Sequence, residues 1–244
     1  MKNEINYDNS NRKRSGENYY YYFTSHEYAI SNIKNNRIKI SSYTSANDIH
    51  ELLSINFSGN DIEAIIAQKH YRTNMGFISF SKYWDNPLMW GHYSDNNQGL
   101  CLGFIINYPM DDTDYRLKKI QPNELDHYTP TNKETSIRNI RCMVNTKSTD
   151  WIYEQESRLF EDLKVRDVET GLYFKELDEK IELKEIIVGP KSQYNPQDVR
   201  CFLDKIRFAG CVKIFKVKPS NELYLLEKDE NFKEEVYSSV NENI

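Results

Sequence analysis

One stretch of the sequence, residues 86–104, restricts the fold more than any other, because it joins an aromatic segment to an apolar one through a turn. Trp90, His92 and Tyr93 crowd its first part, and the turn-forming residues Asp-Asn-Asn-Gln-Gly follow at positions 95–99. Residues 100–106 then favour a buried strand. His92 and Tyr93 are therefore expected beside a loop at the end of a sheet strand.

Hydrophobic periodicity along the rest of the chain predicts both strands and helices. Strands are expected at residues 19–23, 37–41, 76–80, 181–188, 212–217 and 223–226, a hairpin around 169–171, and helices after Ser25, at 60–70, at 133–144 and from Asn195 to Gly210. This order predicts an α+β fold with a mainly antiparallel or split sheet and flanking helices. A doubly wound sheet is disfavoured, and no glycine-rich phosphate-binding motif occurs.

The chain has 244 residues and no Gly/Ser-rich or Pro-rich linker, which predicts a single globular domain over residues 18–227. Its 18 Tyr and 11 Phe supply large side chains for a core. Residues 1–17 are polar without periodicity and are expected to be a disordered leader. Residues 228–244 are expected to be an acidic tail that is frayed or forms a peripheral helix.

The formal net charge of −5 disfavours a dedicated nucleic-acid binder. Basic runs at residues 12–14 and 116–119 are typical of solvated surface, although each remains able to form a local footprint. The four cysteines lack zinc-site spacing, so no metal is expected; Cys101 and Cys211 lie in apolar runs and are expected in the core. No signal peptide and no apolar stretch of ~20 residues is apparent, which predicts a cytoplasmic protein without a membrane partner.

A second cluster, residues 151–160, begins with Trp151 and contains Glu154, Glu156 and Arg158. On a strand these three charged side chains would share one face, so that two carboxylates and a guanidinium converge. On a helix Glu154 and Arg158 would instead form an ordinary ion pair four residues apart. His92, Trp84 and Trp90 have an equally plain alternative as core residues, and both interpretations stay open here.

The order of these elements resembles the bacterial family of domains of unknown function numbered 2971. The resemblance covers about residues 19–190 and rests on an aromatic first strand, a helix at 27–33, Ser-Ser at 41–42, Asn-Asp at 47–48 and the segments at 78–81, 88–93, 99–104, 151–158 and 186–189. The elements Met-Trp-Gly-His-Tyr (89–93) and Tyr-Glu-Gln-Glu-Ser-Arg (153–158) are specific in combination. The chain departs from the family at residues 46–51, which read Ala-Asn-Asp-Ile-His-Glu where Phe-Asn-Asp-Pro-Phe-Glu is usual.

A more distant resemblance is to small ADP-ribosyltransferases that modify nucleic acids. It rests on Tyr22-Phe23-Thr24, a helix ending in Asn-Asn, Ser-Phe-Ser at 79–81, the His-Tyr-Ser-Asp loop at 92–95 and a late carboxylate strand. The resemblance implies an ADP-ribosyltransferase-like fold with NAD as substrate. It implies a catalytic group of Glu156, His92 and Glu154, with Glu156 as the carboxylate at the ribose, and cofactor contacts from Tyr22, Tyr93, Asn47 and Arg158. Tyr22 stands where that superfamily usually has His or Arg.

These resemblances imply a bacterial defence effector or toxin that consumes NAD or a related nucleotide. Its reaction would be ADP-ribosyl transfer to a nucleic-acid or protein acceptor, or NAD hydrolysis, and a partner or inhibitor protein would control it. The alternative is a non-catalytic sensor or adaptor whose Trp- and Tyr-rich face binds a protein or phage component. A nuclease ranks third. The enzyme hypothesis requires His92, Tyr93 and Glu156 to line one pocket, with Trp90 and Trp151 as buried scaffold.

Overall fold

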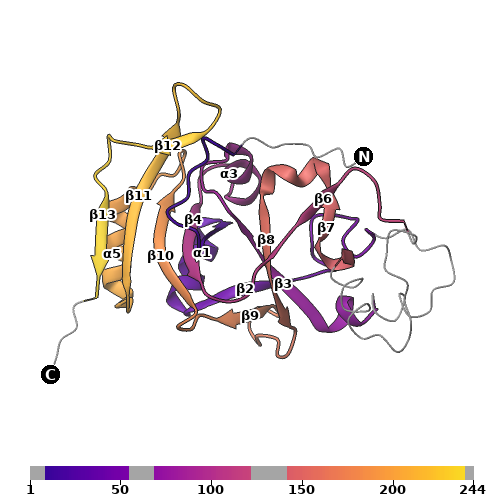
Figure 1. Cartoon of the computed structure of the whole chain (residues 1–244). Helices are drawn as coiled ribbons and strands as arrows, with labels where there is room; N and C mark the ends of the chain where they lie inside the picture. The colour runs from indigo at the N-terminus through magenta and orange to yellow at the C-terminus, as the bar shows by residue number, and fades with distance from the viewer. Residues whose placement is uncertain (1–8, 55–68, 122–141, 240–244) are drawn as a thin grey trace. The chain divides into compact units, whose positions relative to one another are not determined.

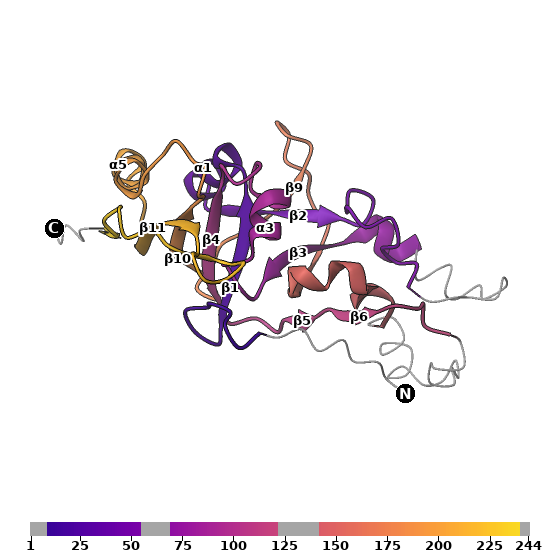
Figure 2. The same cartoon turned by 90° about the horizontal axis from the view of Figure 1, so that it is seen from above.

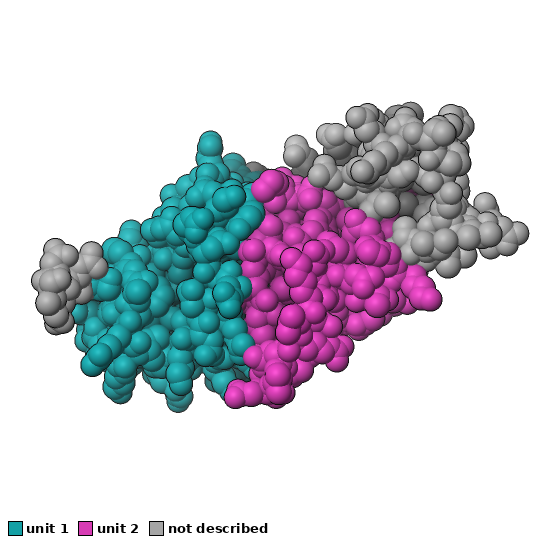
Figure 3. Space-filling model, turned by 90° about the horizontal axis from the view of Figure 1, so that it is seen from below, with its two compact units in different colours: residues 1–37, 80–108, 176–244 teal, residues 38–79, 109–175 magenta. Residues whose placement is uncertain are grey.

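The computed structural model describes residues 9–54, 69–121 and 142–239 (Figure 1). It divides the chain into two units, each assembled from segments that are distant in sequence (Figure 3). Unit 1 comprises residues 1–37, 80–108 and 176–244, and unit 2 comprises residues 38–79 and 109–175.

The strands of unit 1 are hydrogen-bonded in the order β12-β11-β10-β4-β1, and β13 also pairs with β11. Their bounds are β1 Tyr19–Thr24, β4 Leu100–Ile106, β10 Ile181–Val188, β11 Cys211–Pro219, β12 Leu226–Lys228 and β13 Glu235–Ser238. Among the described strands of unit 1, β10 and β11 are the pair that runs in parallel, and the helix α5 (Pro196–Ile206) connects them, as a parallel pair requires. The strand expected at residues 100–106 is confirmed: its first residue, Leu100, pairs with Thr24.

The helices of unit 1 begin at capping residues that the sequence supplies. Ser25 accepts a hydrogen bond from the Tyr28 backbone and starts α1 (His26–Lys34). Asn195 and Asp198 form a reciprocal capping box at the start of α5. Figure 2 shows α1 and α5 on the same side of β4, β10 and β11. The end expected for α5 at Gly210 is wrong, because Arg207 adopts a left-handed conformation (φ 50°) and ends the helix after Ile206.

The aromatic segment ahead of β4 forms a short helix, α3 (Pro87–Tyr93), which the periodicity did not reveal. Asn86 caps it, and three successive left-handed residues at 95–97 reverse the chain toward β4. Gly99 has no substitute here, since a Cβ atom would lie 2.2 Å from the Thr24 carbonyl oxygen. The ring of Trp90 is fully buried, and its Nε1 donates to the Trp84 carbonyl oxygen at 2.6 Å.

Both ends of the described chain are more ordered than the sequence indicates. In the expected leader, the Lys13 backbone N–H donates to the buried Asp85 carboxylate at 2.7 Å, and Arg12 pairs with the same carboxylate at 3.3 Å. A buried carboxylate requires such partners, so it fixes these residues. In the acidic tail, residues 235–238 form β13 rather than a frayed end or a helix. Cys211, expected in the core, is exposed.

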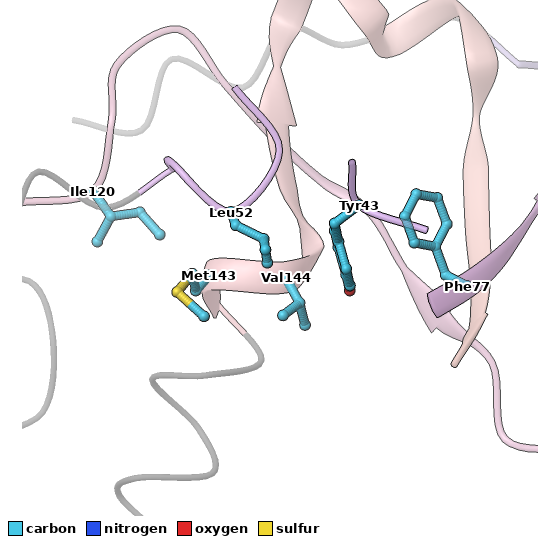
Figure 4. Packing of buried hydrophobic residues seen from close by; sticks show 6 residues of the cluster. All are labelled: Tyr43, Leu52, Phe77, Ile120, Met143 and Val144. Carbon is cyan, nitrogen blue, oxygen red and sulfur yellow. The ribbon is translucent and has the colours of Figure 1, made fainter. Parts of the chain in front are cut away.

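Unit 2 consists of short strands around a separate hydrophobic cluster. Its elements are β2 Arg37–Ser42, β3 Met75–Ser81, β5 Asp111–Asp112, β6 Asp114–Arg116, β7 Thr146–Ser148, the 3-10 helix η2 Thr149–Glu154, β8 Glu156–Asp162 and β9 Tyr173–Glu176. β3 pairs with β2 and β8, and β8 also pairs with β5. The core side chains are Tyr43, Leu52, Phe77, Ile120, Met143 and Val144 (Figure 4). The expected hairpin at 169–171 is reduced to one bridge between Arg166 and Tyr173.

Two expected helices fall largely outside the described residues. Of the helix expected at 60–70, the structure describes only its end, and residues 69–74 are helical. Of the helix expected at 133–144, residues 142–144 are described and helical, and helix continues to residue 145.

The mixed fold with mostly antiparallel strands and few helices is confirmed. The single domain over residues 18–227 and the ADP-ribosyltransferase-like fold stay predictions. Within the three described ranges, the helices are all too short or too polar to cross a membrane.

Replacing Trp90 by Ala should lower the free energy of unfolding by about 3–5 kcal/mol, because it removes a fully buried ring and the hydrogen bond to the Trp84 carbonyl. Urea denaturation measures this loss. Leu88→Ala is the matched control, since Leu88 lies on the same helix with 47% of its surface exposed. Equal small losses in both variants would contradict a scaffold role for Trp90.

Candidate functional site

The two acids of the Glu-x-Glu motif lie on different elements of unit 2. Glu154 is the last residue of η2, whose first turn is capped by Ser148. Gln155 then adopts a left-handed conformation (φ 45°), and Glu156 begins β8. The strand interpretation therefore holds for Glu156 and Arg158, which are two residues apart and share one face of β8. It is wrong for Glu154, and the ordinary helical pair between Glu154 and Arg158 does not form.

A buried lysine brings the two carboxylates together. Lys147 of β7 places its Nζ 2.5 Å from Glu154 Oε2 and 3.3 Å from Glu156 Oε2. Arg158 Nη2 contacts the same Glu156 oxygen at 3.0 Å. All four side chains are almost completely buried.

A fifth charged residue, Glu51, joins these four side chains, although it lies 107 residues before Arg158 in the sequence. Its two carboxylate oxygens accept from both terminal nitrogens of Arg158, at 2.5 and 3.0 Å. Arg158 also donates to the Val144 carbonyl at 2.6 Å and lies over the Phe77 ring at 4.4 Å. We refer to Glu51, Lys147, Glu154, Glu156 and Arg158 as the ion cluster. It joins the 46–51 segment to the Glu-x-Glu-x-Arg element.

Neutral groups complete the surroundings of Glu156. Thr113 Oγ1 donates to Glu156 Oε2 at 3.2 Å, and the nearby Ser79 side chain also favours the ionised form of the carboxylate and lowers its pKa. The Glu156 backbone N–H donates to the Tyr115 hydroxyl at 2.8 Å. The position of this carboxylate is thus fixed by cations and by neutral donors.

The cluster contains three carboxylates and two cations, so with all groups ionised it carries one excess negative charge. Burial alone would raise the pKa of Glu156, but the charges of Arg158 and Lys147 lower it to about 2. Burial raises the pKa of Glu51, and Arg158 offsets only part of that effect. Burial also opposes the charge of Lys147, yet Glu156 and Glu154 leave its pKa above the ordinary value. Of these two acids, Glu156 is therefore held ionised, and Glu51 protonates more readily.

Lys147 also lines a cavity of about 160 Å³ in unit 2. The other lining residues are His50, Ser54, residues 116–119, Thr146 and Ser148. The basic run at 116–119, one of two that the sequence indicates as solvated surface able to form a local footprint, thus borders a cavity that shares a residue with the ion cluster. Among the residues that the structure describes, no group of three or more His, Cys, Asp or Glu side chains has the geometry to hold a metal ion.

The remaining expected site residues lie elsewhere. Asn47 is exposed in unit 2 and does not belong to the ion cluster. Tyr22, His92 and Tyr93 lie in unit 1, where burial raises the pKa of Tyr22 to about 12 and the rings of His92 and Tyr93 meet edge to face at 6.2 Å. The grouping of His92 and Tyr93 with Glu156 in one pocket stays a prediction.

Sequence reasoning missed Glu51 and Lys147 as site residues. Glu51 is the last residue of the 46–51 segment, and the acid at the end of that segment, within the stated resemblance, is the signal that could have identified it. Lys147 lies in a polar stretch with no motif, so only the fold identifies it. Trp151, expected to be buried scaffold, is only half-buried, and Lys147 Nζ lies 4.9 Å from the centre of its ring.

Comparison with known proteins supports the first resemblance. Residues 89–159 match the model of DUF2971, a family described as protein of unknown function. The matched stretch starts with the Met-Trp-Gly-His-Tyr element and ends just after Arg158, so both specific motifs fall within it. No curated protein and no solved structure matches the chain significantly.

Replacing Arg158 by Met should destabilise unit 2 by about 3–5 kcal/mol, because Glu51 and Glu156 would keep buried charge without their main counter-ion. Urea denaturation measures the change. Lys184→Met breaks an exposed pair with Glu182 and should cost at most about 1 kcal/mol. Similar losses in the two variants would refute the central place of Arg158.

The stability of the protein should depend on pH through Glu156. Its folded-state pKa of about 2 lies below the ordinary 4.5, so the ionised form stabilises the fold above about pH 4.5. That contribution is lost as the pH falls toward 2. The raised pKa of Glu51 acts in the opposite direction. Its contribution to the free energy of unfolding is present at low pH and is lost as the pH rises through the folded-state pKa of Glu51.

Unfolding free energies of the parent and of Glu156→Gln, measured between about pH 3 and pH 7, test this dependence. The parent should lose stability more steeply than the variant as the pH falls. Glu51→Gln should remove the component that weakens the fold as the pH rises. Parallel curves for the parent and Glu156→Gln would show that Glu156 is not held ionised.

Proposed function

We propose that this protein consumes NAD, by ADP-ribosyl transfer or by hydrolysis, as an effector of bacterial defence or toxicity. The observation that supports the proposal is a fixed, ionised carboxylate, Glu156, whose partner Lys147 lines a cavity bordered by basic residues. The cavity and the carboxylates thus share one side chain within unit 2.

The chemistry requires a negative charge beside the ribose. Cleavage breaks the bond between the nicotinamide nitrogen and ribose C1′, and the electron pair leaves with nicotinamide. The oxocarbenium-like centre that develops at C1′ is stabilised by an ionised carboxylate. An oxygen of water or of an acceptor then bonds to C1′ and releases its proton to solvent or to a neighbouring base.

Glu156 suits this role better than Glu154. Arg158, Thr113 and Ser79 hold its carboxylate, and its low pKa keeps it ionised at any physiological pH. Glu154 contacts Lys147 and has the role of orienting that ammonium. The cofactor contacts assigned to Tyr22, Tyr93, Asn47 and Arg158, and the catalytic assistance of His92, belong to the same proposal.

Access to Glu156 depends on Lys147, since only 2% of the surface of Glu156 and 3% of that of Glu154 is exposed. An anionic ligand in the cavity competes with both carboxylates for the lysine ammonium. The diphosphate of NAD has this character. We expect its binding to draw Lys147 toward the cavity and to leave Glu156 available to the ribose.

The same burial favours a second function, a non-catalytic sensor or adaptor in which the ion cluster only stabilises the fold. The partner-binding face would then not use Trp84 or Trp90, both of which are buried. Tyr28 and Tyr224, in unit 1, are exposed and belong to such a surface in this alternative.

Incubation of the purified protein with NAD and measurement of released nicotinamide distinguishes the two functions. Glu156→Gln should reduce turnover by on the order of 10²–10³-fold, because it keeps the size of the side chain but removes its charge. Glu154→Gln should reduce it less. Glu182→Gln, an exposed acid in unit 1, serves as the control.

Urea denaturation of each variant shows whether lost turnover reflects lost fold. Turnover in Glu156→Gln equal to that of the parent at matched stability would defeat the assignment. Absence of nicotinamide release from the parent would favour the adaptor.

A further inference from the structure

We infer that the cavity of unit 2, here called the basic cavity, is a binding site for the phosphate group of a ligand. Its lining includes four cationic residues, Arg116, Lys118, Lys119 and Lys147. This inference concerns binding and does not depend on NAD consumption.

The backbone holds the basic run firmly at both ends. On one side, β6 pairs in parallel with β7, which sets Tyr115 opposite Lys147 and Arg116 opposite Ser148. On the other side, the Ile120 backbone N–H donates to the Ser54 carbonyl at 2.8 Å, and the Ile120 side chain is buried in the core of unit 2. The backbone of the run at 116–119 is therefore anchored beside the cavity at both ends, although the side chains of residues 117–119 are exposed.

The charges that line the cavity are unbalanced. Arg116 pairs with Asp114 at 2.7 Å, and Lys147 pairs with Glu154 and Glu156. Lys118 and Lys119 are exposed, and within the described part of the chain no carboxylate pairs with either. No Asp or Glu lines the cavity. A protein with a net charge of −5 thus carries a local site of positive potential.

The remaining groups favour a multiply charged anion. The hydroxyl protons of the two lining serines are already used, since Ser54 donates to the Met143 carbonyl and Ser148 to Asp150, both at 2.9 Å. With these two hydroxyls engaged, the ammonium and guanidinium groups of the lining bind phosphate through charge. A volume of about 160 Å³ accommodates a phosphate or a diphosphate, and the rest of a larger ligand would extend into solvent.

Isothermal titration of the full chain with inorganic pyrophosphate at low ionic strength tests the site. The double variant Lys118→Gln/Lys119→Gln should weaken binding by about tenfold or more, because it removes the two uncompensated charges. Lys164→Gln/Lys233→Gln is the matched control: it makes the same change in net charge at two lysines that are 78% and 87% exposed. The control should change affinity by at most about twofold.

Two further arms identify the source of the phosphate. Titration with ADP and with a short single-stranded oligonucleotide shows whether a nucleotide or a strand binds more tightly, and either result supports the inference. No heat with pyrophosphate, equal weakening in the control variant, or equally tight binding of succinate would overturn it. Because neither lysine belongs to the ion cluster, pyrophosphate binding without nicotinamide release would leave this site standing while the proposed activity fails.

Discussion

The pairing of Arg158 with Glu51 and Glu156 is the interaction on which unit 2 most depends. A guanidinium without solvent exposure requires counter-charges and acceptors, and here two carboxylates and the Val144 carbonyl supply them to its two terminal nitrogens. Those groups come from the loop after β2, from β8 itself and from the residues before β7. One buried charge thereby fixes the register of three segments that local propensity alone would leave loosely placed. Lys147 extends the same constraint to η2 through Glu154.

The sequence predicted elements whose character is local. The run at 100–106 is apolar throughout and flanked by turn residues, so its strand has the bounds that periodicity gives. The capped start of α5 is equally local. The helix α3 was not predicted, because its seven residues are too few for a clear period and its tryptophan and tyrosine also suit a strand. Ordering of Arg12 and Lys13 depends on Asp85, a tertiary partner that no local pattern reveals.

In the candidate site, too, the sequence predicted the local features and missed those that depend on tertiary contacts. Glu156 and Arg158 were found from their spacing of two residues, which is a local feature of a strand. Placing Glu154 beside them required the left-handed turn at Gln155, a conformation unusual for a residue other than glycine and without a sequence signature here. Glu51 and Lys147 are brought in by chain topology. Three of the seven site residues expected from sequence thus belong to the ion cluster, and Tyr22, His92 and Tyr93 lie in the other unit.

The charge balance of unit 2 connects the ion cluster to the basic cavity. The cluster has one carboxylate more than it has cations, whereas the cavity has cations and no lining carboxylate. Lys147 belongs to both, so a change in the contacts of its ammonium group affects the cluster and the cavity together. A cluster of balanced charge would hold Lys147 with little response to a neighbouring anion. Because the cluster has an excess acid and burial raises the pKa of Glu51, the energy of the cluster responds to any anion that withdraws the lysine. Ligand binding in the cavity would then shift the protonation of Glu51, a coupling that structural burial of the cluster alone does not require.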